Sequence, residues 1–120
     1  MAEAGPLARG MVVWAAPDPA VSVVGREQAG RRPVLVVSSA MYLRTVTELV
    51  LTVPVTTIDR GWPNHVELAG DLSLDQDCFA MTEQVRATSR ARLGKVAGRV
   101  DDSTMSTVDV WLSDFLDLGR

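Results

Sequence analysis

Short apolar runs separated by turn-forming residues occupy most of the chain between residues 10 and 97. The runs are rich in valine, leucine and threonine, and glycine, proline and aspartate lie between them. This pattern predicts a small all-β domain, because β-branched residues favour strands whereas Gly, Pro and Asp favour turns. The predicted strands lie at residues 10–15, 32–38, 48–57, 64–68, 78–88 and 93–96.

Two neighbouring stretches depart from this alternation in opposite ways. Residues 33–37 (PVLVV) are continuously apolar, which predicts a central strand that is covered on both faces. Residues 16–33 contain two prolines within four positions, two glycines and mixed charges, and they predict a long loop. Loops of this length in compact domains are usually functional or disordered.

The last twenty residues change to a helical period. Apolar residues recur every three or four positions at Met105, Val108, Trp111, Leu112, Phe115 and Leu116. This spacing predicts an amphipathic helix over residues 101–118, whose aromatic residues pack against the barrel or against a partner. Asp101, Asp102 or Ser103 would cap its first turn, and Gly119 would terminate it.

Length and composition limit the range of possible functions. A chain of 120 residues that is 47% hydrophobic is expected to form one domain, with residues 1–8 as a flexible N-terminus. Its apolar runs are too short to span a membrane and its start does not resemble a signal peptide, so we expect a cytoplasmic protein without membrane contact. The single cysteine, Cys78, and the single histidine, His65, cannot build a zinc site by themselves, and we expect no metal and no cofactor.

The net charge of −3 argues at first against nucleic-acid binding, but the charges are unevenly distributed. Residues 100–120 carry five acids and one base, whereas residues 86–99 carry five bases and no acid. Eleven of the twelve bases are arginine, whose planar guanidinium matches a phosphate with two hydrogen bonds. The negative net charge of the chain therefore comes from its C-terminal tail, and the predicted barrel is basic.

Several familiar catalytic patterns are missing from the sequence. It has no glycine-rich phosphate loop, no GxSxG motif and no close pair of carboxylates of the kind that a metal-dependent nuclease uses. What remains is an arginine-rich loop that leads into a strand at Arg31-Arg32-Pro33, and a second strand that ends in Thr56-Thr57.

Short motifs follow one another in a characteristic order along residues 9–118. They are Arg9-Gly10, Asp18-Pro19, GREQAGRRP at 25–33, VPVTT at 53–57, PNHVEL at 63–68, EQVR at 83–86, Arg92-Leu93 and Gly98. In this order they resemble the MazF/PemK toxins of bacterial toxin–antitoxin systems. The resemblance implies a small SH3-like β-barrel of the CcdB/PemK type, a homodimer, a MazE-like antitoxin as partner, and metal-independent cleavage of single-stranded RNA at short sequences.

The resemblance also implies that Arg32 and Thr56 are catalytic. The implied reaction is attack of a ribose 2′-OH on the adjacent phosphate, which leaves a 2′,3′-cyclic phosphate and a 5′-OH. Because the pKa of arginine exceeds about 12, Arg32 is a poor general base, and we expect it to stabilise the phosphorane and to donate to the leaving group. Thr56 would be a second donor, and the acceptor of the 2′-OH proton is unassigned.

A further group of residues is expected to bind the RNA substrate. These residues are Arg26, Glu27, Gln28, Arg31, Thr57, Gln84 and Arg86. Gln84 and Arg86 lie two apart, so on a strand they would share a face. The chain has Met11 where the family usually has an acid, and Arg26 where it often has serine. The cleavage motif therefore cannot be transferred from a relative, and we expect the loop at residues 16–31 to choose the sequence.

Alternatives remain open for individual residues and for the whole chain. Arg32 alone would be read as an ion-pair partner of Glu27 or Glu83, and Thr57 alone as an ordinary strand residue. Trp62 either stacks on a base or packs over the barrel. For the whole chain, the alternatives are a CcdB-like gyrase inhibitor, although the C-terminus lacks the Trp-Gly-Ile of those proteins, and a non-catalytic interaction barrel.

Overall fold

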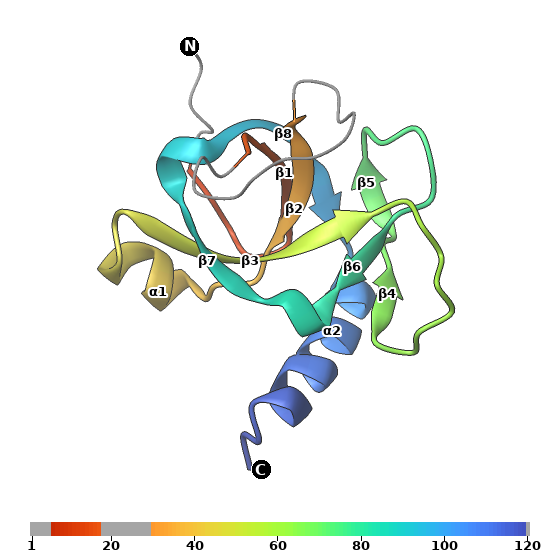
Figure 1. Cartoon of the computed structure of the whole chain (residues 1–120). Coiled ribbons are helices and arrows are strands. Elements are labelled where there is room, and N and C mark those ends of the chain that lie inside the picture. The colour runs from red at the N-terminus through yellow and green to blue at the C-terminus, as the bar shows by residue number, and fades with distance from the viewer. Residues whose placement is uncertain (1–5, 18–29, 120) are drawn as a thin grey trace.

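The computed structural model describes residues 6–17 and 30–119 of the chain (Figure 1). The strands are β1 (Met11–Ala15), β2 (Arg32–Val36), β3 (Leu49–Thr56), β4 (His65–Glu67), β5 (Gly70–Leu72), β6 (Phe79–Met81), β7 (Arg86–Ser89) and β8 (Leu93–Val100). The helices are α1 (Ala40–Thr45) and α2 (Asp102–Phe115), with the 3-10 turns η2 (Thr82–Gln84) and η3 (Arg90–Arg92). The predicted class, mainly β with a C-terminal helix, is confirmed.

The strands form one antiparallel sheet that curls back on itself. Its order is β4-β6-β3-β2-β1-β8-β5, and β7 pairs with residues 49–52 of β3. Although β4 and β5 lie at opposite ends of this order, only Leu68 and Ala69 separate them in the chain. The two ends of the sheet therefore meet at this corner, which gives the barrel-like shape seen in Figure 1.

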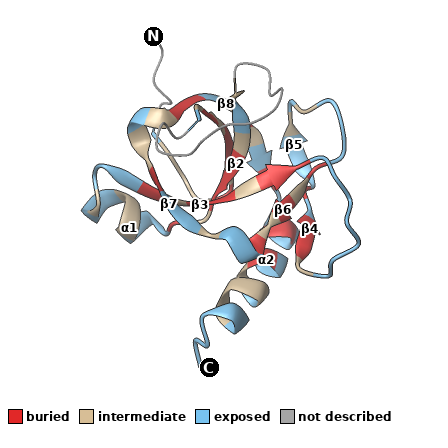
Figure 2. Cartoon of the chain, in the orientation of Figure 1, coloured by how far each residue is buried: buried red, intermediate tan, exposed pale blue. Residues whose placement is uncertain are grey.

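The central position predicted for residues 33–37 is confirmed. β2 lies between β1 and β3, and its side chains alternate between two buried clusters. Leu35 packs with Val12 in one core, whereas Val34 and Val36 pack with Val13 in a second core on the other face of the strand. Figure 2 shows this burial along the strand. A strand that is covered on both faces has no polar alternation, as its sequence indicated.

Helix α2 completes the barrel core from the C-terminal end. The Asp101 carboxylate caps the helix by accepting hydrogen bonds from the backbone N–H of Thr104 at 2.9 Å and from its hydroxyl at 2.7 Å. The hydrogen bonds from Thr104 lower the pKa of Asp101. Met105 and Val108 are buried beside the strands, so the predicted amphipathic face is confirmed for the first half of the helix.

The second half of α2 is covered less than the sequence predicts. The rings of Trp111 and Phe115 lie 5.8 Å apart, but Trp111 is half-buried and Phe115 remains 47% exposed. Leu116 is also exposed. The helix ends at Phe115, although the apolar spacing continues to Leu116, and its last turn extends beyond the strands (Figure 1).

Helix α2 ends at Phe115 with Leu116 as its C-cap, and the expectation that Gly119 terminates it is wrong. Asp117 adopts the left-handed conformation, with φ 55°. The N–H of Leu118 donates to the carbonyl of Ser113 at 2.9 Å, and the N–H of Asp117 donates to Asp114 at 3.2 Å. This is the hydrogen-bond pattern of a Schellman motif, with aspartate in the position that glycine usually takes.

The strand predicted at residues 78–88 is wrong as a single element. Val55 of β3 pairs with Ala80 of β6, whereas Thr52 pairs with Arg86 of β7. These two ladders are out of register with each other, so residues 82–84 leave the sheet as η2. Thr82 in this turn is fully buried, and its hydroxyl donates to the carbonyl of Asn64 at 2.7 Å.

Two short elements were not predicted, and one predicted strand is longer than expected. β5 is three residues long, and α1 has six residues with none buried, so neither produces a periodic signal. β8 continues to Val100 because it pairs with both β1 and β5.

Candidate active site

Arg32 and Thr56 lie beside each other on neighbouring strands. Arg32 opens β2 and Thr56 closes β3. The ladder between these strands pairs Val34 with Pro54 and Leu35 with Val53, and the same register continued by two positions brings Arg32 opposite Thr56. Residues that oppose each other across an antiparallel ladder share a face of the sheet. The two residues expected to be catalytic are thus brought together by the backbone pairing.

Both residues line one cavity of about 360 Å³. Arg31 and Thr57, which were expected to bind substrate, line it as well. Its other lining residues include the indole-bearing Trp14 and the segment of residues 73–76, which follows β5. That segment reaches the ends of β2 and β3 because the sheet curls until its ends meet.

No sequence motif indicates these additional lining residues. Trp14 is half-buried against the core and also lines the cavity. Residues 73–76 carry no motif and follow a strand that was not predicted. Only the three-dimensional curl of the sheet brings them to Arg32.

The hydroxyl of Thr56 is held in one orientation. Thr56 is 9% exposed, and its Oγ1 accepts a hydrogen bond from the backbone N–H of Ile58 at 3.1 Å. Because this bond uses a lone pair of the oxygen, the hydroxyl proton remains available to a group in the cavity. Arg32 and Arg31 are exposed residues at this cavity.

Cys78 also lines the cavity but is a poor proton acceptor. Burial raises the pKa of its thiol, and the nearby Asp77 carboxylate raises it further. The thiol therefore stays protonated at neutral pH. Within residues 6–17 and 30–119, no three His, Cys, Asp or Glu side chains lie close enough together to hold a metal ion.

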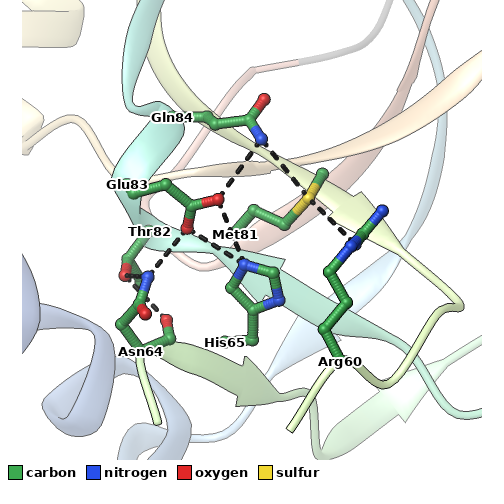
Figure 3. A network of polar contacts seen from close by, with 7 residues as sticks. All are labelled: Arg60, Asn64, His65, Met81, Thr82, Glu83 and Gln84. Atoms are coloured by element: carbon green, nitrogen blue, oxygen red, sulfur yellow. Dashed lines mark hydrogen bonds and ion pairs between the residues drawn. The ribbon is translucent and has the colours of Figure 1, made fainter. Parts of the chain in front are cut away.

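A polar network lies next to β6, around Glu83 (Figure 3). The His65 Nε2 atom lies 3.1 Å from both Glu83 carboxylate oxygens, and the Asn64 amide donates to Oε1 at 2.7 Å. Burial pushes the pKa of Glu83 upward, but the hydrogen bonds from His65, its own backbone and Gln84 outweigh it, and the pKa lies below its usual value. Glu83 is thus held as a carboxylate.

His65 opens β4, an edge strand of the sheet, and it is buried. Its ring lies against the indole of Trp62, with centroids 4.7 Å apart and planes tilted by 48°. Trp62 itself is 50% exposed. The arrangement fixes the imidazole between a carboxylate and an aromatic ring, and it leaves a large part of the indole accessible.

Comparison with known proteins identifies the family. Residues 8–116 match the family described as the PemK-like, MazF-like toxin of type II toxin–antitoxin systems. The chain belongs to the PemK/MazF toxin family. The resemblance drawn from the sequence motifs is therefore confirmed.

Individual relatives of this PemK/MazF chain are similar over most of their length. The endoribonuclease toxin MazF of Escherichia coli K12 is 38% identical over 92 residues, which cover 76% of this chain and 77% of the relative. Endoribonuclease EndoA of Bacillus subtilis is 34% identical over 103 residues, covering 84% and 86%. A MazE–MazF crystal structure from Deinococcus radiodurans superposes with a TM-score of 0.76 at 28% identity, covering 95% of this chain and 98% of that one.

The remaining expected substrate-binding residues of the PemK/MazF chain lie elsewhere. Gln84 lies in η2 and Arg86 opens β7, so the expectation that they share one strand face is wrong. Both are exposed, and neither lines the cavity. Arg26, Glu27 and Gln28 lie outside the described residues.

No helix in the described part of the chain has the length and apolar character needed to cross a membrane.

Proposed function

We propose that this chain is the endoribonuclease toxin of a type II toxin–antitoxin system and cleaves single-stranded RNA. The observation that carries the proposal is the position of Arg32 and Thr56, which lie at adjoining ends of the antiparallel strands β2 and β3 and line one cavity. Relatives named as endoribonucleases, at 34–38% identity over most of the chain, support it.

The proposed reaction uses the substrate's own nucleophile. The 2′-OH attacks the adjacent phosphorus, the bond to the 5′ oxygen of the next nucleotide breaks, and the products are a 2′,3′-cyclic phosphate and a 5′-OH. The negative charge that develops on the phosphorane needs hydrogen-bond donors held in place before the reaction. No step in this route requires a metal ion.

Arg32 and Thr56 supply these donors. The guanidinium of Arg32 donates two hydrogen bonds in one plane, which fits the phosphorane oxygens or one of them together with the leaving 5′ oxygen. The Thr56 hydroxyl donates a further bond, because its oxygen is already engaged by the N–H of Ile58. Arg32 therefore acts by electrostatic stabilisation and by donating hydrogen bonds.

The basic surface of the barrel attracts the RNA. Arg31 lines the cavity, and Arg86 and Gln84 bind more distant nucleotides. Arg26, Glu27, Gln28 and Thr57 complete the predicted substrate contacts. Because the net negative charge comes mainly from the tail, the barrel itself presents phosphate-binding arginines.

The proposal includes a MazE-like antitoxin, a homodimer and action in the cytoplasm. Solved relatives include MazE–MazF complexes, which supports an antitoxin partner. An acidic and apolar disordered segment would suit the same basic surface and would displace RNA. The half-exposed aromatic end of α2 is consistent with a partner covering it.

The test is cleavage of a mixed-sequence RNA by the purified chain in the presence of EDTA, with sequencing of the new 5′ ends. We expect fragments with 5′-OH ends at a short common sequence. Intact RNA would refute the proposal, and so would an Arg32→Ala variant that cleaves as well as the parent. A gyrase supercoiling assay run in parallel distinguishes the CcdB-like alternative.

A further inference from the structure

Asp75 is the one acidic side chain among the described residues that line the cavity. It lies in the segment at residues 73–76, and it is exposed. Its carboxylate makes no hydrogen bond and no ion pair with any residue that the structure describes. An acidic residue without a partner among the described residues thus lines the same cavity as Arg31, Arg32 and Thr56.

A carboxylate at this position cannot favour the phosphate itself. Two like charges in one small site repel, and an ionised carboxylate offers only hydrogen-bond acceptors. RNA carries complementary donors on its bases, among them the exocyclic amines of adenine, cytosine and guanine. The chemistry of Asp75 therefore points to the edge of a base and away from the backbone.

The cavity has the size and the surface to receive a base. Its volume of about 360 Å³ lies in the range of small-molecule pockets. Trp14, Ile58 and Leu74 supply apolar surface beside the polar residues. Unstacked bases of single-stranded RNA are recognised by such apolar contacts together with hydrogen bonds on their edges.

We propose that Asp75 selects a base with an exocyclic amine next to the scissile phosphate and disfavours uracil there. The inference rests on the proposed RNA cleavage. A carboxylate accepts a hydrogen bond from the amine of cytosine, whereas uracil presents a carbonyl oxygen at the same position and is repelled. Arg32 and Thr56 then act on the RNA whose base is bound by the segment at residues 73–76.

The experiment compares substrates that differ by a single amine. Once the cleaved sequence is known, each base that flanks the scissile phosphate is replaced by its counterpart without the amine: cytosine by uracil, adenine by purine, guanine by hypoxanthine. For the parent protein we expect kcat/KM to fall about tenfold or more at one flanking position. For Asp75→Asn we expect the ratio between the two substrates to fall towards one.

Asp77→Asn is the matched control, because Asp77 is an exposed acid two residues further along that does not line the cavity. It removes the same charge and should retain the parent's preference. Thermal unfolding of both variants checks that the fold is intact.

The outcomes separate this inference from the proposed function. A parent protein that cleaves no RNA refutes both. A parent that cleaves, together with an Asp75→Asn variant of unchanged preference, overturns only the role of Asp75. A flanking base whose amine makes no difference overturns it as well. A uniform loss of kcat on every substrate, with an altered pH profile, would instead make Asp75 a proton acceptor in the reaction.

Discussion

Arg32 and Thr56 lie at the adjoining ends of the antiparallel strands β2 and β3, and both residues line the same cavity. The ladder that joins β2 to β3 ends at Val34 and Pro54, two positions before this pair, so the backbone pairing next to them limits how far the two residues can move apart. A site built on paired strands holds its side chains more firmly than one built on loops. Electrostatic stabilisation of a transition state depends on this kind of fixed placement.

The first prediction concerns the guanidinium. Arg32→Ala should lower the rate of RNA cleavage roughly 10²- to 10³-fold, because it removes preorganised donors to the phosphorane. Arg32→Lys keeps the charge but loses the planar pair of donors, so its cleavage rate should lie between those of the parent and of Arg32→Ala. Single-turnover cleavage with EDTA present measures both. Thermal unfolding should be nearly unchanged, since the residue is exposed.

The hydroxyl of Thr56 gives a second prediction, for which the chain offers near-isosteric variants. Thr56→Val removes the donor to the phosphate and the acceptor for the N–H of Ile58, and it should slow cleavage roughly a hundredfold. Thr56→Ser retains both functions and should stay close to the parent. A valine variant as active as the serine variant would show that the hydroxyl does not take part.

A third prediction concerns the buried hydrogen bond between β3 and β7. The hydroxyls of Thr52 and Thr88 lie 2.8 Å apart, and both residues are fully buried. Either single change to valine leaves the other hydroxyl without its partner and should cost about 1–3 kcal/mol of unfolding free energy. The double variant should recover most of this loss. Urea unfolding of all four proteins measures the coupling, and strictly additive costs would contradict it.

Glu83 makes the stability depend on pH. The pKa of Glu83 lies below its ordinary value of 4.5 in the folded chain, so the unfolded chain binds a proton more readily. Its contribution to stability is complete above the unfolded pKa and is lost as the pH falls through the lower folded pKa. Glu83→Gln should be less stable than the parent at pH 7, and the difference between them should narrow in acid. A constant difference in melting temperature across this range would argue against it.

The last prediction uses the left-handed residue after α2. Asp117→Gly should stabilise the chain by about 1 kcal/mol, because glycine adopts a positive φ without a clash at Cβ. Gly119→Ala is the control: a Cβ at that position meets nothing within 4 Å, and little change is expected. Denaturant unfolding compares the two. If both variants behave alike, the helix end does not contribute to the measured stability.

The sequence predicted the parts of the fold that carry a local pattern. The continuous apolar run of β2 and the helical period of α2 were recognised because each buries a face that its own spacing defines. The break at Thr82 was not, since it depends on how two segments pair with different parts of β3. Gly119 was preferred over Asp117 because composition alone favours glycine at a helix end.

The same distinction applies to the candidate site, where residues in local motifs were predicted and residues brought in by the curl of the sheet were not. Arg32 and Thr56 were recognised because each belongs to a short motif, and their register then follows from the pairing of consecutive strands. Asp75 was missed, since its segment is remote in the sequence and reaches the cavity only through the curl of the sheet. Gln84 and Arg86 were placed on one strand face, and the η2 turn separates them.

The corner at Leu68 and Ala69 joins the two ends of the sheet through the chain itself, without a ladder between β4 and β5. The segment at residues 73–76 is tied instead to β8, where the N–H of Ser73 donates to Ala97 at 2.6 Å. Insertions or substitutions in this segment therefore need not disturb the pairing of β2 with β3. We therefore expect that changes in this segment can alter the RNA sequence that is cleaved while the cleavage reaction stays the same.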